Sequence, residues 1–74
     1  MRGSTDPRVL FGNRLRELRL RSGFTQESLA ARAHLHRNYV GGVERGERNI
    51  SLINIIELAR ALSVRPAEFL KNIP

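Results

Sequence analysis

Cysteine and tryptophan are absent from the sequence, which has one tyrosine, three phenylalanines and a single lysine. The lack of cysteine excludes a disulfide framework and a zinc site built from thiolates. No apolar run approaches the roughly 18 residues that a membrane-spanning helix needs, and no signal-peptide core is present. We therefore expect a cytoplasmic protein without a membrane partner.

The length and the net charge limit the number of domains and the kind of partner. A chain of 74 residues forms one domain at most, and so small a core often gains stability by pairing with a second copy. The formal net charge is +6, and 12 of the 13 basic residues are arginine. This balance indicates a polyanionic partner, since arginine suits bidentate contacts to phosphate and guanine. Charge alone leaves open a basic surface that only keeps the protein soluble.

The apolar spacing predicts an all-α fold of five helices, with neither strand-like alternation nor an internal repeat. The predicted helices span residues 9–22, 26–33, 37–45 and 52–62, followed by a short last helix that begins at Pro66. On the first of these helices Phe11, Leu15 and Leu18 share the inner face, which places Arg14 among the charged residues of the outer faces.

The second and third helices are joined by a tight bend. Thr25 is placed to cap the second helix through its side-chain oxygen, and His36 is placed to cap the third, although histidine caps poorly. Only His34 and Leu35 remain for the bend, so the two helices must cross steeply, as in a helix-turn-helix. His34 is expected either to adopt a left-handed conformation or to shift the turn.

Two runs carry a family resemblance: Thr-Gln-Glu-Ser-Leu-Ala at residues 25–30 and Tyr-Val-Gly-Gly-Val-Glu-Arg-Gly-Glu-Arg-Asn at residues 39–49. The chain resembles the Cro and phage-repressor (Xre-type) helix-turn-helix family over roughly residues 11–70. Within it, the chain most resembles the controller proteins of bacterial restriction–modification systems. The resemblance implies a repressor-like DNA-binding fold and an autoregulated transcriptional regulator, acting as a homodimer on a palindromic operator in double-stranded DNA, without a small-molecule effector.

Polar side chains at the start of the third helix suit the edges of DNA bases. An arginine fork matches the O6 and N7 acceptors of guanine, and an asparagine amide can bond N6 and N7 of adenine. Together with the resemblance, this predicts base reading by Arg37, Asn38, Tyr39 and Gly41. We expect Gly41 and Gly42 to face outward and let the helix lie close to DNA; close packing against another helix is the alternative.

Further roles follow from the resemblance. The predicted contacts to the DNA backbone are Gln26, His36, Arg45, Arg48 and Asn49. Arg19 and Glu44 are expected to form a structural ion pair, largely out of solvent. Residues 52–62 are apolar nearly all round, so one side must face the core and another a partner. The predicted dimer interface consists of Ile53, Ile56, Phe69, Leu70 and Ile73.

Catalysis and metal binding find little support. His34 and His36 have no third ligand nearby, so no metal site is predicted. The serines lack a base at a recognisable spacing, and no phosphate-cradling glycine loop is present. We therefore predict a protein that is not an enzyme and has no cofactor.

Residues 1–7 show no periodicity and are predicted to be a flexible basic arm or an expression leader, which leaves residues 8–74 as the DNA-binding and dimerisation domain. Three alternatives stay open: a phage repressor or antitoxin of the same fold, the DNA-binding end of a longer chain, and a protein-interaction module of the bridging-factor kind.

Overall fold

The computed structural model describes residues 5–74, which form four α-helices and one 3-10 helix and contain no strand. The elements are α1 (Pro7–Arg21), α2 (Gln26–Ala33), α3 (Arg37–Glu44), α4 (Leu52–Leu62) and the 3-10 helix η1 (Pro66–Leu70). None of these helices is long and apolar enough to cross a membrane. The all-α class is confirmed, but the prediction of a fifth α-helix is wrong. A five-residue segment is too short to offset the cost of nucleating an α-helix, and tighter 3-10 turns are common in pieces of this length.

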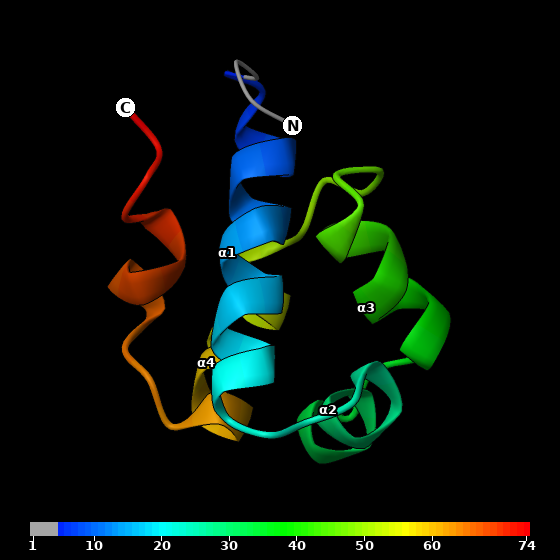
Figure 1. The fold of residues 1–74 in the computed structure, drawn as a ribbon. Helices are drawn as coiled ribbons and strands as arrows, with labels where there is room; N and C mark the ends of the chain where they lie inside the picture. The colour runs from blue at the N-terminus through cyan, green and yellow to red at the C-terminus, as the bar shows by residue number, and fades with distance from the viewer. Residues whose placement is uncertain (1–4) are drawn as a thin grey trace.

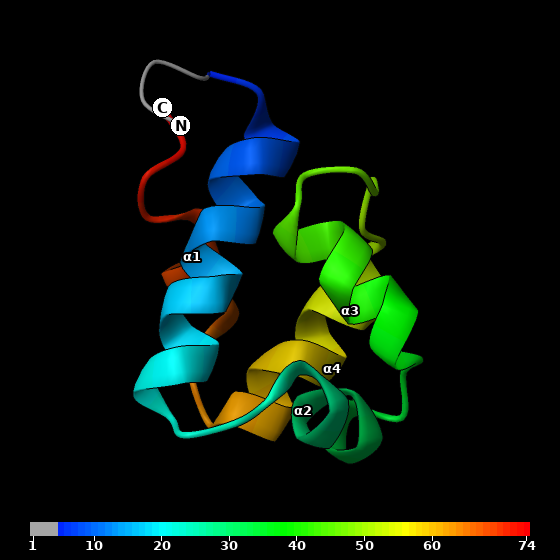
Figure 2. The ribbon, with the colours of Figure 1, turned by 45° about the vertical axis from the view of Figure 1, so that its right-hand side comes forward.

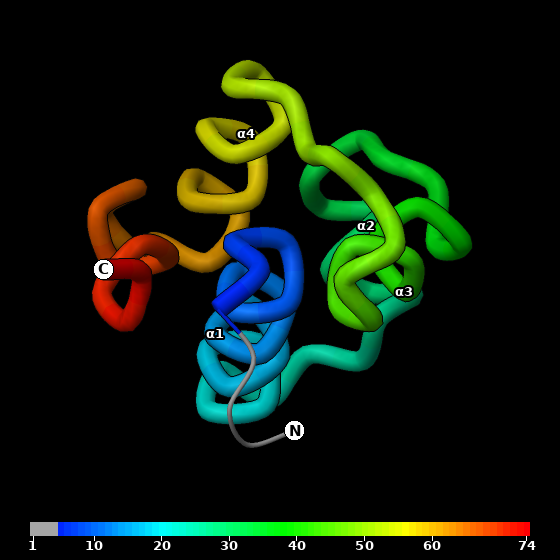
Figure 3. Tube along the Cα trace, turned by 90° about the horizontal axis from the view of Figure 1, so that it is seen from above, coloured from blue at the N-terminus to red at the C-terminus, as the bar shows by residue number. Residues whose placement is uncertain are grey.

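Helix α1 stands in the middle of the molecule, with α3 on one side and η1 on the other (Figure 1). Helix α2 lies across the lower ends of α3 and α4 and packs against both (Figure 2). Seen from above, α1 separates the C-terminal segment from α2 and α3 (Figure 3). Helix α3 therefore rests on α1 and α2 at the edge of the molecule, with its outer side uncovered by other elements.

All five helices contribute to one core. The largest fully buried side chains are Leu15, Leu29, Val40, Val43, Leu58 and Phe69. The placement of Phe69 in the dimer interface is wrong, because its side chain is 0% exposed and its ring lies 5.2 Å from that of Phe11, between centroids. Phe69 anchors the short η1 segment on α1, since a segment of five residues needs a large buried group to hold it in place.

Side-chain caps fix where α2 and α4 begin. Thr25 Oγ1 accepts the Ser28 N–H at 2.9 Å, and Ser28 Oγ accepts the Thr25 N–H at 2.9 Å, which satisfies both helix-start donors reciprocally. Ser51 Oγ accepts the Asn54 N–H at 3.1 Å at the start of α4. His36 makes no side-chain cap hydrogen bond, so α3 starts without one. His34 adopts the left-handed conformation with φ 60°, the first of the two predicted alternatives.

Helix α1 begins at Pro7, two residues before the predicted start at Val9. Asp6 caps it by accepting the N–H of Arg8 at 2.9 Å, and proline at the first helical position needs no N–H partner. The Arg8 side chain, and then its N–H, hold the pKa of Asp6 below its ordinary value. Residues 1–4 of the predicted arm lie outside the described residues.

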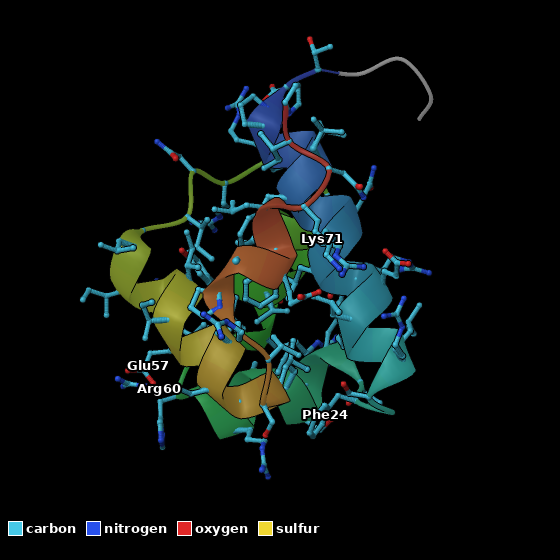
Figure 4. The ribbon with its side chains drawn as sticks, turned by 90° about the vertical axis from the view of Figure 1, so that its left-hand side faces the viewer. Phe24, Glu57, Arg60 and Lys71 are labelled. Carbon is cyan, nitrogen blue, oxygen red and sulfur yellow. The ribbon has the colours of Figure 1, made fainter. Side chains whose placement is uncertain are left out.

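Arg14 is buried, contrary to its predicted place on an outer face. Its Nε donates to the Glu68 carbonyl oxygen at 2.7 Å, and its terminal nitrogens donate to the carboxylates of Glu68 and Glu17 at 2.8 and 3.0 Å. The apolar stem of an arginine can lie in a core when its head finds acceptors, and here Glu68 of η1 supplies two of them and Glu17 of α1 the third. Lys71, beside η1 in Figure 4, and then Arg14 hold the pKa of Glu68 below its ordinary value.

Candidate nucleic-acid interface

Two polar residues, Arg37 and Asn38, lie on the exposed side of α3 in its first turn. Val40 and Val43 are fully buried on the opposite side of the helix, so its orientation is fixed by the core. The Arg37 side chain is 63% exposed, and its nearest carboxylate, that of Glu27, lies 4.0 Å away. Such an exposed, long pair contributes little energy, which leaves the Arg37 guanidinium able to exchange partners. Asn38 beside it is exposed as well.

Tyr39, the third predicted base reader, is half-buried and packs against the core. Its hydroxyl oxygen accepts a hydrogen bond from the Asn54 side-chain amide at 3.0 Å. The Arg48 guanidinium lies over its ring, 5.7 Å from the centroid. Tyr39 is therefore held between α4 and the segment after α3, whereas Arg37 is exposed and has only the long contact with Glu27. No local pattern indicates a role for Asn54, because it lies 15 residues further along the chain.

Gly41 and Gly42 do not lie open on the surface, so their predicted outward exposure is wrong. Both are buried, and flexible side chains cover them. A Cβ at Gly41 would lie 3.1 Å from a guanidinium nitrogen of Arg45, and one at Gly42 would lie 3.0 Å from the Cγ of Arg48. The covering groups are flexible side chains: the Gln26 carboxamide comes from the start of α2, and Arg45 and Arg48 come from the segment after α3. In this arrangement Gly41 offers no surface to a base.

A buried ion pair fixes the far end of α3. Glu44 accepts from Arg19 Nε at 2.6 Å and from a terminal Arg19 nitrogen at 3.0 Å, and the two side chains are 3% and 7% exposed. Arg19 also donates to the Phe24 carbonyl oxygen at 2.9 Å. Gln26, predicted to contact DNA phosphate, donates its amide to Glu44 at 3.0 Å. Helices α1, α2 and α3 are thus joined through one carboxylate.

The other predicted backbone contacts lie at the two ends of α3. His36 precedes the helix, whereas Arg45, Arg48 and Asn49 follow it, and all four are exposed. Arg45 reaches back over Gly41 and also meets the Glu47 carboxylate at 3.1 Å. We refer to the following residues together as the α3 surface: Gln26, His36, Arg37, Asn38, Tyr39, Arg45, Arg48 and Asn49. Three arginines give this surface a positive charge that Glu27 and Glu47 only partly offset.

A compact positive surface around a protruding helix end can bind a polyanion. Arginine and asparagine side chains carry the donors and acceptors of base edges, and the other arginines can neutralise phosphates on either side. Within residues 5–74, no group of three or more His, Cys, Asp or Glu residues is placed to hold a metal ion. The α3 surface itself offers hydrogen-bonding groups and positive charge.

Comparison with known proteins also indicates a protein that binds nucleic acid. A helix-turn-helix family model matches residues 15–69. Control protein C.BamHI from Bacillus amyloliquefaciens is 47% identical over 64 residues, which cover 85% of this chain and 79% of that protein. Control protein C.MunI from Mycoplasma sp is 36% identical over 69 residues, or 92% of this chain and 93% of that protein.

A solved structure is similar in fold as well as in sequence. The restriction–modification controller protein C.AhdI from Aeromonas hydrophila superposes with a TM-score of 0.83 at 58% identity, covering 84% of this chain and 94% of that one. Regulators with a helix-turn-helix bind double-stranded DNA. The chain therefore belongs to the Xre-type helix-turn-helix family of transcriptional regulators, together with the control proteins of restriction–modification systems.

Proposed function

We propose that this chain binds a palindromic operator as a homodimer and acts as the autoregulated controller of a restriction–modification system. The observation that supports this most is the exposure of Arg37 and Asn38 in the first turn of α3. The opposite side of this helix is buried in the core. The relatives named as control proteins support the biological setting. The bacterial cytoplasm is the expected location, because the target is DNA.

Base reading is assigned to the start of α3. The guanidinium of Arg37 would take the O6 and N7 acceptors of a guanine, and the amide of Asn38 would take N6 and N7 of an adenine. Tyr39 would contribute from the edge of the surface, since only part of its ring is exposed. Gly41 is left out of this assignment because Gln26 and Arg45 cover it.

Backbone contacts are assigned to the rest of the α3 surface. His36, Arg45, Arg48 and Asn49 flank the helix on both sides, so they could reach phosphates on either side of a major groove. Arg45 would release its present contact with Glu47 to do so. Gln26 would donate the second N–H of its amide, or the backbone N–H groups at the start of α2, while Glu44 accepts the first amide N–H.

The second copy is assigned to the apolar side of α4 and the C-terminal segment. Leu52 and Ile53 are 71% and 68% exposed, and Leu70 is also exposed, whereas Ile56 and Ile73 are half-buried. Exposed apolar side chains of this size on so small a domain mark a surface for a partner. A twofold dimer would place its two α3 helices in successive major grooves, about 34 Å apart.

No catalytic step, cofactor or effector is assigned to the protein. The proposed activity needs only reversible binding, and dimerisation makes occupancy of DNA rise steeply with protein concentration. A controller that times its own expression needs such a concentration-dependent response.

Replacing Arg37 tests the proposal. Arg37→Ala should cost about 1–3 kcal/mol of binding to the operator and relax the preference at one base pair, with a much smaller loss on random DNA. The measurement is a titration of both DNAs, over a range of salt concentrations, with wild-type and variant protein. Arg60→Ala is the matched control, because it removes the same charge from an exposed site on α4 (Figure 4).

Two results would count against the proposal. Equal losses on operator and random DNA for Arg37→Ala would refute base reading by that side chain. Wild-type protein that binds all DNA alike, even in the region upstream of its own gene, would refute the sequence-specific regulator and favour a protein-interaction module.

A further inference from the structure

We infer that Asn54, in the first turn of α4, is a positioning residue for DNA binding. Its side-chain amide holds the Tyr39 hydroxyl, and the Tyr39 ring in turn holds the Arg48 guanidinium on the α3 surface. The inference rests on the proposed function, because it assumes that Tyr39 and Arg48 face DNA. It adds a residue outside the helix-turn-helix to the recognition apparatus.

The hydrogen bond joins two elements that are distant in sequence. Asn54 Nδ2 donates to Tyr39 Oη at 3.0 Å, and both residues are half-buried. The Asn54 backbone is itself fixed, because its N–H donates to the capping Ser51 Oγ at 3.1 Å. The donor therefore sits on a rigid helix start, and it limits the rotation of the only tyrosine in the chain.

The direction of this bond matters for DNA. An asparagine Nδ2 can only donate, so the Tyr39 oxygen is the acceptor and its own proton remains available. A hydroxyl that accepts one hydrogen bond becomes a better donor for a second. The Tyr39 O–H is thereby prepared to donate to an acceptor outside the protein, such as a phosphate oxygen or a base edge.

Arg48 depends on the same ring. Its guanidinium lies 5.7 Å from the Tyr39 ring centroid, and its Cγ crosses the bare backbone of Gly42. Arg48 is otherwise exposed in the segment between α3 and α4. A long side chain without such support would lose more conformational entropy on binding DNA than one already held near its bound position.

A double-mutant cycle tests the inference on DNA. Asn54→Ala should weaken operator binding about threefold to tenfold, as expected for the loss of one hydrogen bond. In a Tyr39→Phe background, which lacks the accepting oxygen, the same substitution should change the affinity less than about twofold. An equal loss in both backgrounds would mean that Asn54 acts on DNA by itself, and no loss in either would mean that it does not act at all; both results overturn the inference.

Tyrosine fluorescence tests the positioning without DNA. Tyr39 is the sole tyrosine and there is no tryptophan, so the emission of the protein reports on this ring alone. Asn54→Ala should add a fast component to the anisotropy decay while leaving the melting temperature within about 2 °C of the wild type. An unchanged decay would overturn the inference. If wild-type protein showed no operator preference while the decay changed as expected, the proposed function would fail and the link from Asn54 to Tyr39 would stand.

Discussion

At the scale of single residues, Glu44 has the widest structural role. Its carboxylate accepts hydrogen bonds from Arg19 on α1 and Gln26 on α2 while it closes the end of α3. Among residues 5–74, no buried side-chain nitrogen or oxygen lacks a hydrogen-bond partner. The charge of Glu44 is therefore fully compensated, and removing it would leave Arg19 buried without a counter-ion.

Glu44→Ala should lower the free energy of unfolding by about 3–5 kcal/mol, because an uncompensated buried guanidinium is strongly destabilising. Thermal unfolding at fixed protein concentration measures the loss. Glu47→Ala is the control, since the Glu47 carboxylate is exposed and pairs with the exposed Arg45. A Glu44→Ala melting curve that matches the control would contradict this role of the pair.

The sequence predicts residues well where their surroundings are local. Arg37 and Asn38 were expected on the exposed side of the third helix, and they lie there because Val40 and Val43 define its inner side. Arg14 was placed wrongly because its acceptors come from Glu68, 54 residues away. The cover over Gly41 likewise depends on how two separate segments fold back, which no local pattern encodes.

At the scale of elements, the approach of α1 to α3 depends on Gly12. A Cβ there would meet the Val43 carbonyl oxygen and lie 2.6 Å from the Glu44 carbonyl oxygen. Both obstacles are backbone atoms, which cannot rotate aside. The tilt of α3 against α1 therefore depends on the absence of a side chain at Gly12. The direction in which Arg37 projects depends on this tilt.

Gly12→Ala should therefore lower the free energy of unfolding by about 1–3 kcal/mol, as expected for overpacking. The sign of this change in stability is informative, because alanine in an unobstructed helix would raise the free energy of unfolding by about 1 kcal/mol over glycine. Urea denaturation measures the change, with Asn13→Ala at the exposed neighbouring position as the control. A more stable Gly12→Ala protein would show that α1 and α3 are not in tight contact.

Helix boundaries were predictable where a cap or a stop is local. The bounds of α2 and α4 are as predicted, because Thr25 and Ser51 cap their starts through side-chain oxygens. Helix α1 starts earlier than predicted, because Asp6 and Pro7 form a helix start although residues 1–7 show no apolar periodicity. The 3-10 form of η1 was not predictable, since apolar spacing over five residues does not distinguish a 3-10 helix from a turn of α-helix.

At the scale of the whole molecule, the proposed dimer would cover the apolar side of α4. Ile53→Glu should raise the dissociation constant of the dimer by at least about tenfold, because it buries an unpaired carboxylate in the interface. Sedimentation equilibrium measures this constant. Leu20→Glu is the matched control, since Leu20 is an exposed apolar residue on α1. If both variants dimerise with the same dissociation constant as the wild type, the interface lies elsewhere.

The most direct measurement of the central claim, that α3 enters the major groove, is a dimethyl sulfate footprint on DNA upstream of the gene. This reagent methylates guanine at N7 in the major groove and adenine at N3 in the minor groove. We predict protection of guanine N7 in two patches about 34 Å apart, one for each α3 helix of a dimer. Protection confined to adenine N3, or bound DNA without protected guanines at either patch, would contradict the account.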